Sequence, residues 1–347
     1  MTSHKWPRAA LALTPTPLQY LPRLSSETGV DFWLKREDLS GDIGLGGNKV
    51  RKLEFLLGEA LANGATHVLT TGGPQSNHAR ATAAAAARLG LACVLVLAGR
   101  EPGSREGNLL LDQLFGAEVR FPGAVTELDQ ARCLAEAAAA IEAAGGQPYV
   151  VPIGGSTPLG TLGSCECYEE IAASAPGADW LCCATGTGGT HAGLVLGALR
   201  AAASAGRPAA AGAAAAAGAA AAAAAPAPRI QAFSVWQPAT WLEPVTRELV
   251  TGAARLLALT LPEPPPLEID DRYLAPRYGK ASPAGLAAIS LLARLEGVVL
   301  DHVYTGKAMA GVLDYIRQGI IRRGERVVFV HTGGAPAIFA AEAVRQI

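Results

Sequence analysis

A glycine-rich segment that ends in a lysine is the stretch of this sequence best suited to covalent chemistry. Gly44 to Asn48 leads directly into Lys49, and a helical pattern follows. Glycine lets a backbone approach a ligand closely, and desolvation in such a loop would lower the pKa of the lysine. A neutral amine forms Schiff bases with carbonyl groups. The segment therefore indicates that Lys49 holds an aldehyde cofactor. The alternative is an exposed lysine at a helix start, with Arg51 and Lys52 as solvated neighbours.

A second glycine-rich loop, residues 185–190, has the composition of a phosphate-binding site. It lies between a predicted strand and a predicted helix, so backbone N–H groups and the helix N-terminus can converge on an anion. It lacks the Walker lysine and the dinucleotide spacing, which favours a monophosphate over a nucleotide. The alternative is a turn that only tightens the packing of helix on strand. The residues expected around the anion are Thr187, Gly188, Gly189 and Thr190.

A third polar loop, residues 72–78, also follows a predicted strand. The Asn77 amide can donate to a phenolic oxygen, and Ser76 and His78 can hold a carboxylate. Ser and Asn are also favoured as N-caps, so these residues can instead, or in addition, begin the helix at Ala79. A Ser–His hydrolase is disfavoured, because the sequence around Ser76 is not a G-x-S-x-G nucleophile elbow.

Two tyrosines and a threonine complete the candidate site. Tyr304 follows a predicted strand at 298–300, and Tyr278 lies in a loop beside a proline. A tyrosine near a Schiff base can act as acid or base, or hold a substrate group. Packing at a domain cleft explains Tyr278 about equally well, and Tyr304 less well. Thr332 can offer a neutral hydroxyl to a pyridine nitrogen; ordinary turn chemistry is the alternative.

Strands that alternate with helices must position these residues. The alternation recurs along the chain and predicts an α/β fold with open, twisted parallel sheets. Ligands bind beyond the carboxyl ends of such strands. The length of 347 residues suggests about two domains. The alanine-rich residues 201–228 are interpreted as a low-complexity insertion without chemistry. The loops expected at the carboxyl edge are 72–78, 185–190, 301–306 and 331–334.

Composition excludes several classes of protein. The formal net charge of -1 argues against a nucleic-acid partner. No apolar run approaches the ~20 residues of a membrane span, and the first residues lack the apolar region of a signal peptide. The six cysteines match no zinc pattern. We therefore expect a cytoplasmic protein with reduced thiols, no metal and no membrane partner.

Five motifs, taken together, resemble the pyridoxal-phosphate enzymes that include 1-aminocyclopropane-1-carboxylate deaminase and D-cysteine desulfhydrase. The motifs are 46–54, 75–78, 186–193, 303–307 and 331–334. The resemblance covers nearly the whole chain apart from the alanine-rich insertion. It implies the fold of the tryptophan synthase β subunit, called fold type II, and a homodimer. The implied large, cofactor-binding domain comprises 1–52 and 166–347, and the implied small domain comprises 53–165.

The resemblance also implies a role for each candidate residue. Lys49 would form the Schiff base with pyridoxal phosphate and move the proton on the substrate Cα. Asn77 would contact the phenolic oxygen of the cofactor, and residues 187–190 would hold its phosphate. Thr332 completes the expected cofactor-binding set. The residues expected near the substrate, a small amino acid, are Ser76, Asn77, His78, Tyr278 and Tyr304.

Two positions bear on the substrate. The deaminase usually carries a glutamate where Thr305 stands, and tends to carry glutamine where His78 stands. A carboxylate near the pyridine nitrogen deepens the electron sink of the cofactor, and a threonine hydroxyl does not. A milder sink suits loss of a good leaving group from Cβ. The sequence therefore favours β-elimination of D-cysteine to pyruvate, ammonia and sulfide. Deamination of the cyclopropane, sulfo-lysis of L-cysteate, a non-catalytic binding protein and a nucleotide-binding enzyme are the alternatives.

Overall fold

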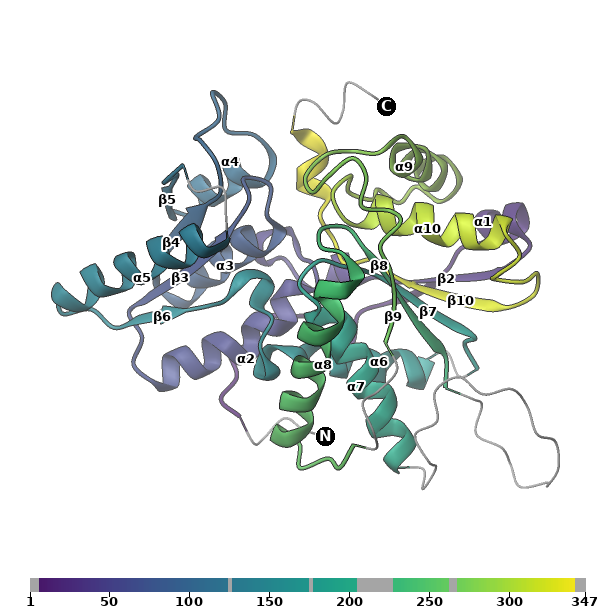
Figure 1. Cartoon of the computed structure of the whole chain (residues 1–347), viewed down its shortest axis with the longest axis horizontal. Helices are drawn as coiled ribbons and strands as arrows, with labels where there is room; N and C mark the ends of the chain where they lie inside the picture. Colours follow the sequence, from purple (N-terminus) through teal and green to yellow (C-terminus); the bar gives the residue numbers. More distant parts are fainter. Residues whose placement is uncertain (1–5, 124–126, 175–176, 205–226, 262–266, 341–347) are drawn as a thin grey trace.

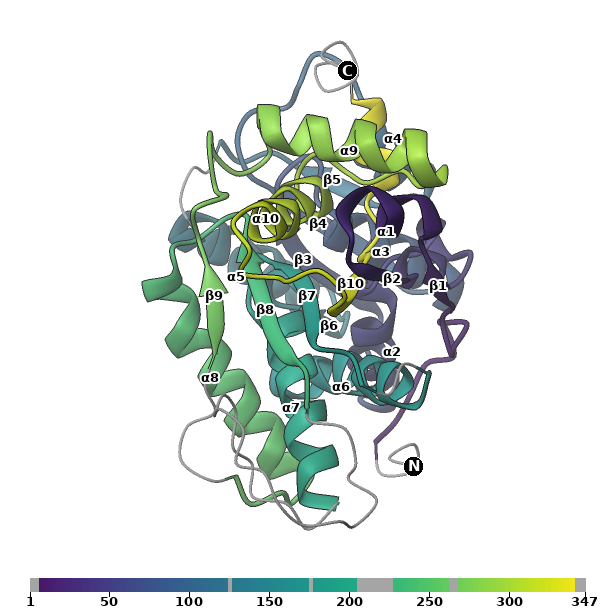
Figure 2. The ribbon, with the colours of Figure 1, turned by 90° about the vertical axis from the view of Figure 1, so that its right-hand side faces the viewer.

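Two β-sheets lie side by side in the computed structural model, each covered by helices (Figure 1, Figure 2). The structure describes residues 6–123, 127–174, 177–204, 227–261 and 267–340. Most of the predicted alanine-rich insertion, 205–226, lies outside these residues. Helix α7 (Gly189–Ser204) ends directly before it, and strand β8 (Arg229–Ser234) begins shortly after it.

The larger sheet has six strands in the order β1-β2-β10-β7-β8-β9. All neighbouring strands are parallel except the edge pair β1–β2. Val330 pairs with both Lys35 and Cys183, so β10 and β2 end level with each other and β7 continues two residues further, to Thr185. The loops 331–334 and 185–190 consequently leave the same edge of the sheet. The strands not yet given bounds are β1 (Leu18–Tyr20), β2 (Asp31–Lys35), β10 (Arg326–Val330), β7 (Trp180–Thr185) and β9 (Glu268–Asp270).

Successive residues of β7 pack on opposite faces of this sheet, because side chains alternate along a strand. Trp180 and Cys182 belong to a core with the helices of one face, and Leu181 and Cys183 to a core with those of the other. The first face carries α1 (Pro22–Thr28), α9 (Pro283–Glu296) and α10 (Thr305–Arg317). The second face carries α6 (Pro158–Ser174) and α7. Both faces are covered, as parallel sheets require.

The smaller sheet has four parallel strands in the order β5-β4-β3-β6. Helices α3 and α4 pack on one face and α5 on the other. Helix α2 (Lys49–Ala62) contacts both α3 of this layer and α6 of the larger one. The division into domains 1–52 with 166–347, and 53–165, stays a prediction. The bounds are β5 (Glu118–Arg120), β4 (Ala92–Leu97), β3 (His67–Gly72), β6 (Pro148–Val150), α3 (Asn77–Leu89), α4 (Gly107–Leu114) and α5 (Glu127–Ala143).

The α/β class with parallel sheets is confirmed, but one expected strand is wrong. Residues 298–300 are not a strand, so the loop 301–306 does not leave a strand end. Val298 and Leu300 are buried in the core that also contains α9 and α10. The segment therefore stays within the helical layer and does not reach the sheet. Its apolar residues are explained by this burial.

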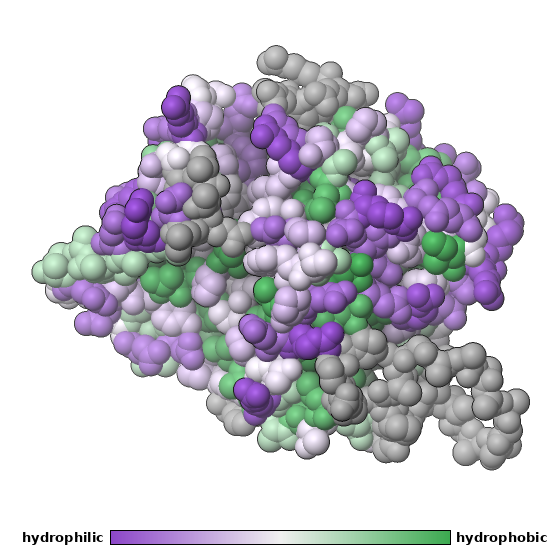
Figure 3. Space-filling view, viewed as in Figure 1, coloured by the Kyte–Doolittle hydropathy of each residue, from purple (hydrophilic) through white to green (hydrophobic). Residues whose placement is uncertain are grey.

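No helix among the described residues is long and apolar enough to cross a membrane. Hydrophilic residues are spread over the face that Figure 3 shows, between smaller apolar areas. The six cysteines are free thiols, five of them buried and Cys133 partly so.

Candidate active site

The first two predicted loops meet at Lys49. This lysine is the first residue of α2, and its Nζ donates to Asn48 Oδ1 over 3.0 Å. The amide nitrogen of Asn48 donates in turn to Thr190 Oγ1 at 2.8 Å, across 142 positions of sequence. The glycine-rich loop before Lys49 and the predicted phosphate loop are therefore joined by a buried hydrogen bond.

The surroundings of Lys49 favour a neutral amine. Part of the side chain remains accessible, but the ammonium lies deep among protein atoms. Burial lowers its pKa from 10.5 to about 8, with the charge of Asp301 opposing this change and that of Arg80 adding to it. The alternative interpretation is an exposed lysine with Arg51 and Lys52 as solvated neighbours. It is wrong about these two residues, because each is only 1% exposed.

The phosphate loop packs tightly against Ser156 and Lys52. A Cβ atom added to Gly189 would lie 2.5 Å from Ser156 Oγ and 2.6 Å from Lys52 Nζ. The hydroxyls of Ser156 and Thr187 lie 2.7 Å apart. Gly188 has a φ of +77°, a conformation that favours glycine. Only glycine leaves room here for backbone N–H groups, two hydroxyls and an ammonium to surround one small anion.

Lys52 supplies the positive charge of this cradle. Its ammonium donates to two neutral groups, Gly154 O at 3.3 Å and Ser156 Oγ at 3.4 Å, and burial lowers its pKa well below the ordinary value. A buried cation with neutral partners is costly, and a phosphate group would complement it. The residues present thus fit the phosphate of pyridoxal phosphate. Sequence reasoning missed Lys52, although it lies three positions after Lys49 and therefore on the same helix face.

The loop 72–78 supplies hydrogen-bond donors from the smaller sheet. Ser76 is the N-cap of α3, and its Oγ accepts from Ala79 N at 3.2 Å. Asn77 Oδ1 accepts from Asn108 Nδ2 at 2.8 Å, which orients the Asn77 amide. A Cβ atom added to Gly334 would lie 2.8 Å from Asn77 Nδ2. The donor end of Asn77 thus lies beside the loop 331–334 of the larger sheet.

His78 lies behind this loop in a neutral state. Its Nε2 is 2.8 Å from Thr70 Oγ1, and that hydroxyl donates to Val151 O. Nε2 must therefore carry the ring proton, and Nδ1 is an acceptor without a hydrogen-bond partner. Burial and the charges of Lys49 and Lys52 lower the pKa of His78 well below its ordinary value. The expected contact of His78 with a substrate carboxylate stays a prediction.

The two tyrosines lie between the polar loops. Their phenol oxygens are 2.5 Å apart. A Cβ atom added to Gly73 would lie 3.4 Å from the Tyr278 ring, and one added to Gly186 would lie 3.7 Å from the Tyr304 ring. Burial raises the pKa of Tyr278 to about 12, and that of Tyr304 well above its ordinary value. Both phenols are therefore protonated at neutral pH.

Asp301 is a buried carboxylate that sequence reasoning also missed. It is 0% exposed, and accepts from the backbone N–H groups of Tyr304 at 3.0 Å and Thr305 at 2.8 Å. The Thr305 hydroxyl donates to it at 2.6 Å. Thr305 stands at the position where the deaminase usually carries a glutamate near the pyridine nitrogen. In this structure its hydroxyl is bound to the carboxylate of Asp301. A Cβ atom added to Gly334 would lie 2.7 Å from Asp301 Cγ, which places this carboxylate beside the same loop as Asn77.

Thr332 contributes through its backbone. Its carbonyl accepts from Asn48 N at 3.1 Å, which anchors the loop before Lys49 on the loop 331–334. The proposed contact of its hydroxyl with a ring nitrogen stays a prediction.

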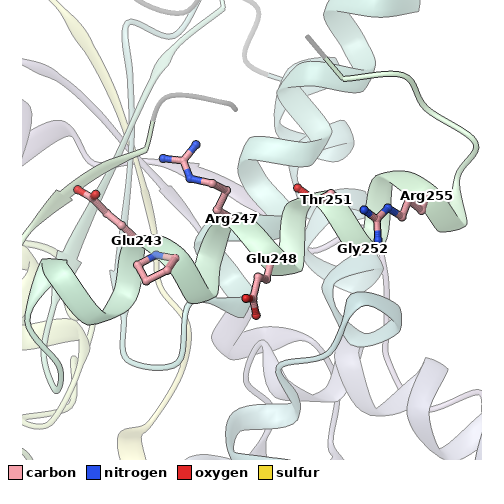
Figure 4. A pocket seen from close by; sticks show the side chains of 7 residues that line it. Glu243, Arg247, Glu248, Thr251, Gly252 and Arg255 are labelled. Carbon is pink, nitrogen blue, oxygen red and sulfur yellow. The ribbon is translucent and has the colours of Figure 1, made fainter. Parts of the chain in front are cut away.

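A hollow on the outer face of α8 (Ala239–Leu256) lies away from this chemistry (Figure 4). Thr246 of the same helix is buried, and its Oγ1 would lie 2.6 Å from a Cβ atom added to Gly188 of the phosphate loop. The residues of the hollow occupy the opposite side of the helix and mix both signs of charge. They are Glu243, Pro244, Arg247, Glu248, Thr251, Gly252 and Arg255.

Known proteins resemble this chain over nearly its whole length. The family of pyridoxal-phosphate dependent enzymes matches residues 9–333. A D-cysteine desulfhydrase of Klebsiella pneumoniae (strain 342) is 41% identical over 344 residues, which are 97% of this chain and 96% of the relative. One of Yersinia pestis (strain Pestoides F) is 42% identical with the same coverage.

Solved structures support the same assignment. A crystal structure of an ACC deaminase homologue is 36% identical, with a TM-score of 0.84, and the match covers 99% of this chain and 97% of that one. Threonine deaminase isoform 2 from Solanum lycopersicum, at 17% identity and a TM-score of 0.62, shares the fold; the match covers 93% of this chain and 80% of that one. The chain therefore belongs to the fold type II, pyridoxal-phosphate-dependent enzymes.

Proposed function

We propose that this protein is a lyase that removes the β-thiol of D-cysteine and yields sulfide, pyruvate and ammonia. The observation that carries the proposal is the placement of two lysines on one face of α2. Lys49, with its lowered pKa, is joined through Asn48 to the phosphate loop, and Lys52 lies against that loop. The substrate follows from the relatives, which are D-cysteine desulfhydrases at 41% and 42% identity.

Each part of the cofactor has residues suited to hold it. Lys52, Ser156 and the loop 187–190 would hold the phosphate, and Asn77 Nδ2 would donate to the phenolic oxygen. When bound, pyridoxal phosphate supplies an electron sink for negative charge on the substrate Cα. Lys49 Nζ takes the Cα proton, because its pKa of about 8 leaves a useful neutral fraction near neutral pH. Ser76 Oγ and the Asn77 amide orient the substrate carboxylate.

The tyrosine pair assists the leaving group in this proposal. The electron pair of the Cα–H bond forms a double bond between Cα and Cβ as the bond between Cβ and sulfur breaks, and the electron pair of the broken bond leaves with the sulfur. Addition of water then gives pyruvate and ammonia. Tyr278 and Tyr304 are both protonated and share one hydrogen bond, so one phenol proton remains for the departing thiolate. Asp301 fixes the backbone at Tyr304 and thereby the position of its ring.

A product assay with three substrates, measured side by side, tests the proposal. Pyruvate and sulfide from D-cysteine are expected. Oxobutanoate from 1-aminocyclopropane-1-carboxylate in their place would overturn the choice of substrate in favour of deamination. Sulfite from L-cysteate would favour the sulfo-lyase. A protein that takes up the cofactor but forms no product from any of the three would be a binding protein.

We also infer a cytoplasmic homodimer. The free cysteines suit a reducing compartment. Large apolar side chains remain exposed on two elements that contact each other, Leu114 at the end of α4 (69% exposed) and Phe339 in the short helix η4 (Ala335–Phe339; 73% exposed). Exposed apolar residues that cluster favour a protein interface. Sedimentation at micromolar concentration would show twice the mass of the chain, and a monomer would overturn this inference.

A further inference from the structure

Two charged side chains of the smaller layer are buried and lack hydrogen bonds that their chemistry requires. Arg80 on α3 and Asp112 on α4 are each 1% exposed. Within the described part of the chain, Arg80 Nε and Nη1 and both carboxylate oxygens of Asp112 have no hydrogen-bond partner. Buried polar groups in this state are rare in native proteins, and each needs an explanation. In the site as described above, Arg80 acts only through its charge on Lys49, and Asp112 has no role.

The two residues continue a contact that orients a candidate cofactor ligand. Asn77 and Arg80 are about one turn apart on α3, and Asn108 and Asp112 are about one turn apart on α4. Asn108 Nδ2 donates to Asn77 Oδ1 at 2.8 Å. One turn further along, Arg80 and Asp112 occupy the corresponding positions. They make no hydrogen bond with each other, but each charge favours the ionised form of the other.

Arg80 reaches from this pair to the loop that carries Lys49. Its Nη2 donates to Gly46 O at 3.2 Å, and a Cβ atom added to Gly47 would lie 3.6 Å from the same nitrogen. The backbone at Gly46 has little freedom on its other side, since a Cβ atom there would lie 2.2 Å from Asp38 O. A movement of Arg80 would therefore be passed on to Lys49, three residues after Gly46.

From this geometry we infer that Arg80 and Asp112 are a positioning pair for Lys49. The charge of Asp112 attracts the guanidinium, the guanidinium donates to the Gly46 carbonyl, and the loop thereby presents the Lys49 amine. The nearby cation also favours the neutral form of that amine. The inference depends on the proposed role of Lys49, and the test below separates the two.

Titration of Asp112 should make the positioning of Lys49 depend on pH. Burial raises the pKa of Asp112 to about 7, and the charge of Arg80 opposes this change. Cys93 on β4 also faces Asp112, but burial raises the pKa of its thiol to about 12, outside the range of interest. Lys49 and Asp301 face Arg80. Loss of the Asp112 charge below neutral pH should loosen the pair, whereas Lys49 changes its charge at higher pH.

The experiment measures how fast the apoenzyme takes up pyridoxal phosphate, from the visible absorbance band, between pH 6 and 10. The variants are R80K, R80M and D112N. Arg88→Met is the matched control, because Arg88 lies on the same helix in an exposed ion pair with Asp42. R80M should slow uptake by at least about tenfold, and should move the Lys49 midpoint upward from about 8. R80K keeps the positive charge, so it should retain the wild-type midpoint for Lys49. Its uptake of the cofactor should still be slow. D112N should take up the cofactor slowly, and its uptake rate should lack the change near pH 7 that titration of Asp112 causes in wild type.

The outcomes are distinct. If R80M and D112N fold with native circular dichroism and take up the cofactor with wild-type rates and midpoints, the pair has no positioning role. If R80M does not fold, D112N decides the question by the presence or absence of the step near pH 7. If Lys49→Ala forms the same visible band as wild type, the proposed role of Lys49 fails, whatever the Arg80 variants do.

Discussion

The phenol oxygens of Tyr278 and Tyr304 lie 2.5 Å apart, and their rings meet edge to face at 75°. Tyr278 lies in the loop before α9, and Tyr304 directly precedes α10. Asp301 accepts from Tyr304 N, and Lys307 Nζ donates to Arg277 O, so both tyrosine segments are fixed by neighbours in sequence or in space. The pair is thus a rigid source of one phenol proton beside the polar loops.

Removal of either phenol should impair elimination. We expect Y278F and Y304F each to lower kcat/KM for D-cysteine by about 10²- to 10⁴-fold, the range for loss of a general acid, with little change in cofactor affinity. Y273F is the matched control, because its phenol donates to Asp314 at 2.6 Å in a different part of the larger layer. Steady-state sulfide release would measure this. Wild-type kcat/KM in both site variants would show that the pair has no proton-transfer role.

Replacement of Lys52 should stabilise the apoenzyme but weaken the binding of pyridoxal phosphate. In K52M we expect the dissociation constant for pyridoxal phosphate to rise by at least about 100-fold, because a buried charge partner is lost. The apoenzyme should instead have a higher Tm, since a buried ammonium with neutral partners is removed.

Absorbance titration and calorimetry measure the two effects of Lys52. Inorganic phosphate should raise the Tm of wild type but not of K52M. Lys280→Met, at an exposed position, should behave as wild type in every assay. A K52M protein with wild-type affinity would remove Lys52 from the phosphate site.

The lowered pKa of Lys49 predicts a pH-dependent stability of the apoenzyme. The folded pKa of about 8 lies below the ordinary value of 10.5. Between these values the unfolded chain binds more protons, so Lys49 makes the free energy of unfolding increase with pH. K49M removes this contribution. The Tm of K49M minus that of wild type should therefore be largest near pH 7 and should shrink toward pH 10. A difference that is constant with pH would contradict the buried ammonium.

The Thr305 hydroxyl should matter as a partner of Asp301. T305V leaves one bond of a buried carboxylate unmade, and we expect it to lower the free energy of unfolding by about 1–3 kcal/mol. T305S keeps the hydroxyl and should stay within about 1 kcal/mol of wild type. Urea unfolding at pH 7 provides the measurement. Equal stability of T305V and wild type would show that the bond of 2.6 Å does not support Asp301.

Local composition was sufficient to predict the loops and most strands of the site. Strands β7 and β10 lead into the predicted loops 185–190 and 331–334, because an apolar run followed by glycine and threonine marks a strand end. Helix α6 was not expected. Gly163 packs so closely on Arg51 of α2 that a Cβ atom would lie 2.6 Å from the Arg51 carbonyl. Glycine at such contacts weakens the apolar periodicity from which a helix is predicted.

Partners far apart in sequence account for what could not be predicted at the site. Lys52 and Ser156 are 104 positions apart, and only the fold brings them together. Asp301 binds backbone N–H groups, which leave no mark in the side-chain pattern. The surroundings of Arg80 and Asp112 depend on how α3 packs on α4. Spacing indicated which loops meet, but not which charges lie between them.

Chemical trapping tests the central claim most directly. The holoenzyme is reduced with borohydride, which fixes the cofactor to the amine that holds it, and the digested protein is then examined by mass spectrometry. Lys49 and Lys52 are only three residues apart, so the assignment must distinguish them by fragment ions. We predict the added mass on Lys49, with Lys52 unmodified. Added mass on Lys52 or on another lysine, with Lys49 unmodified, would contradict the account.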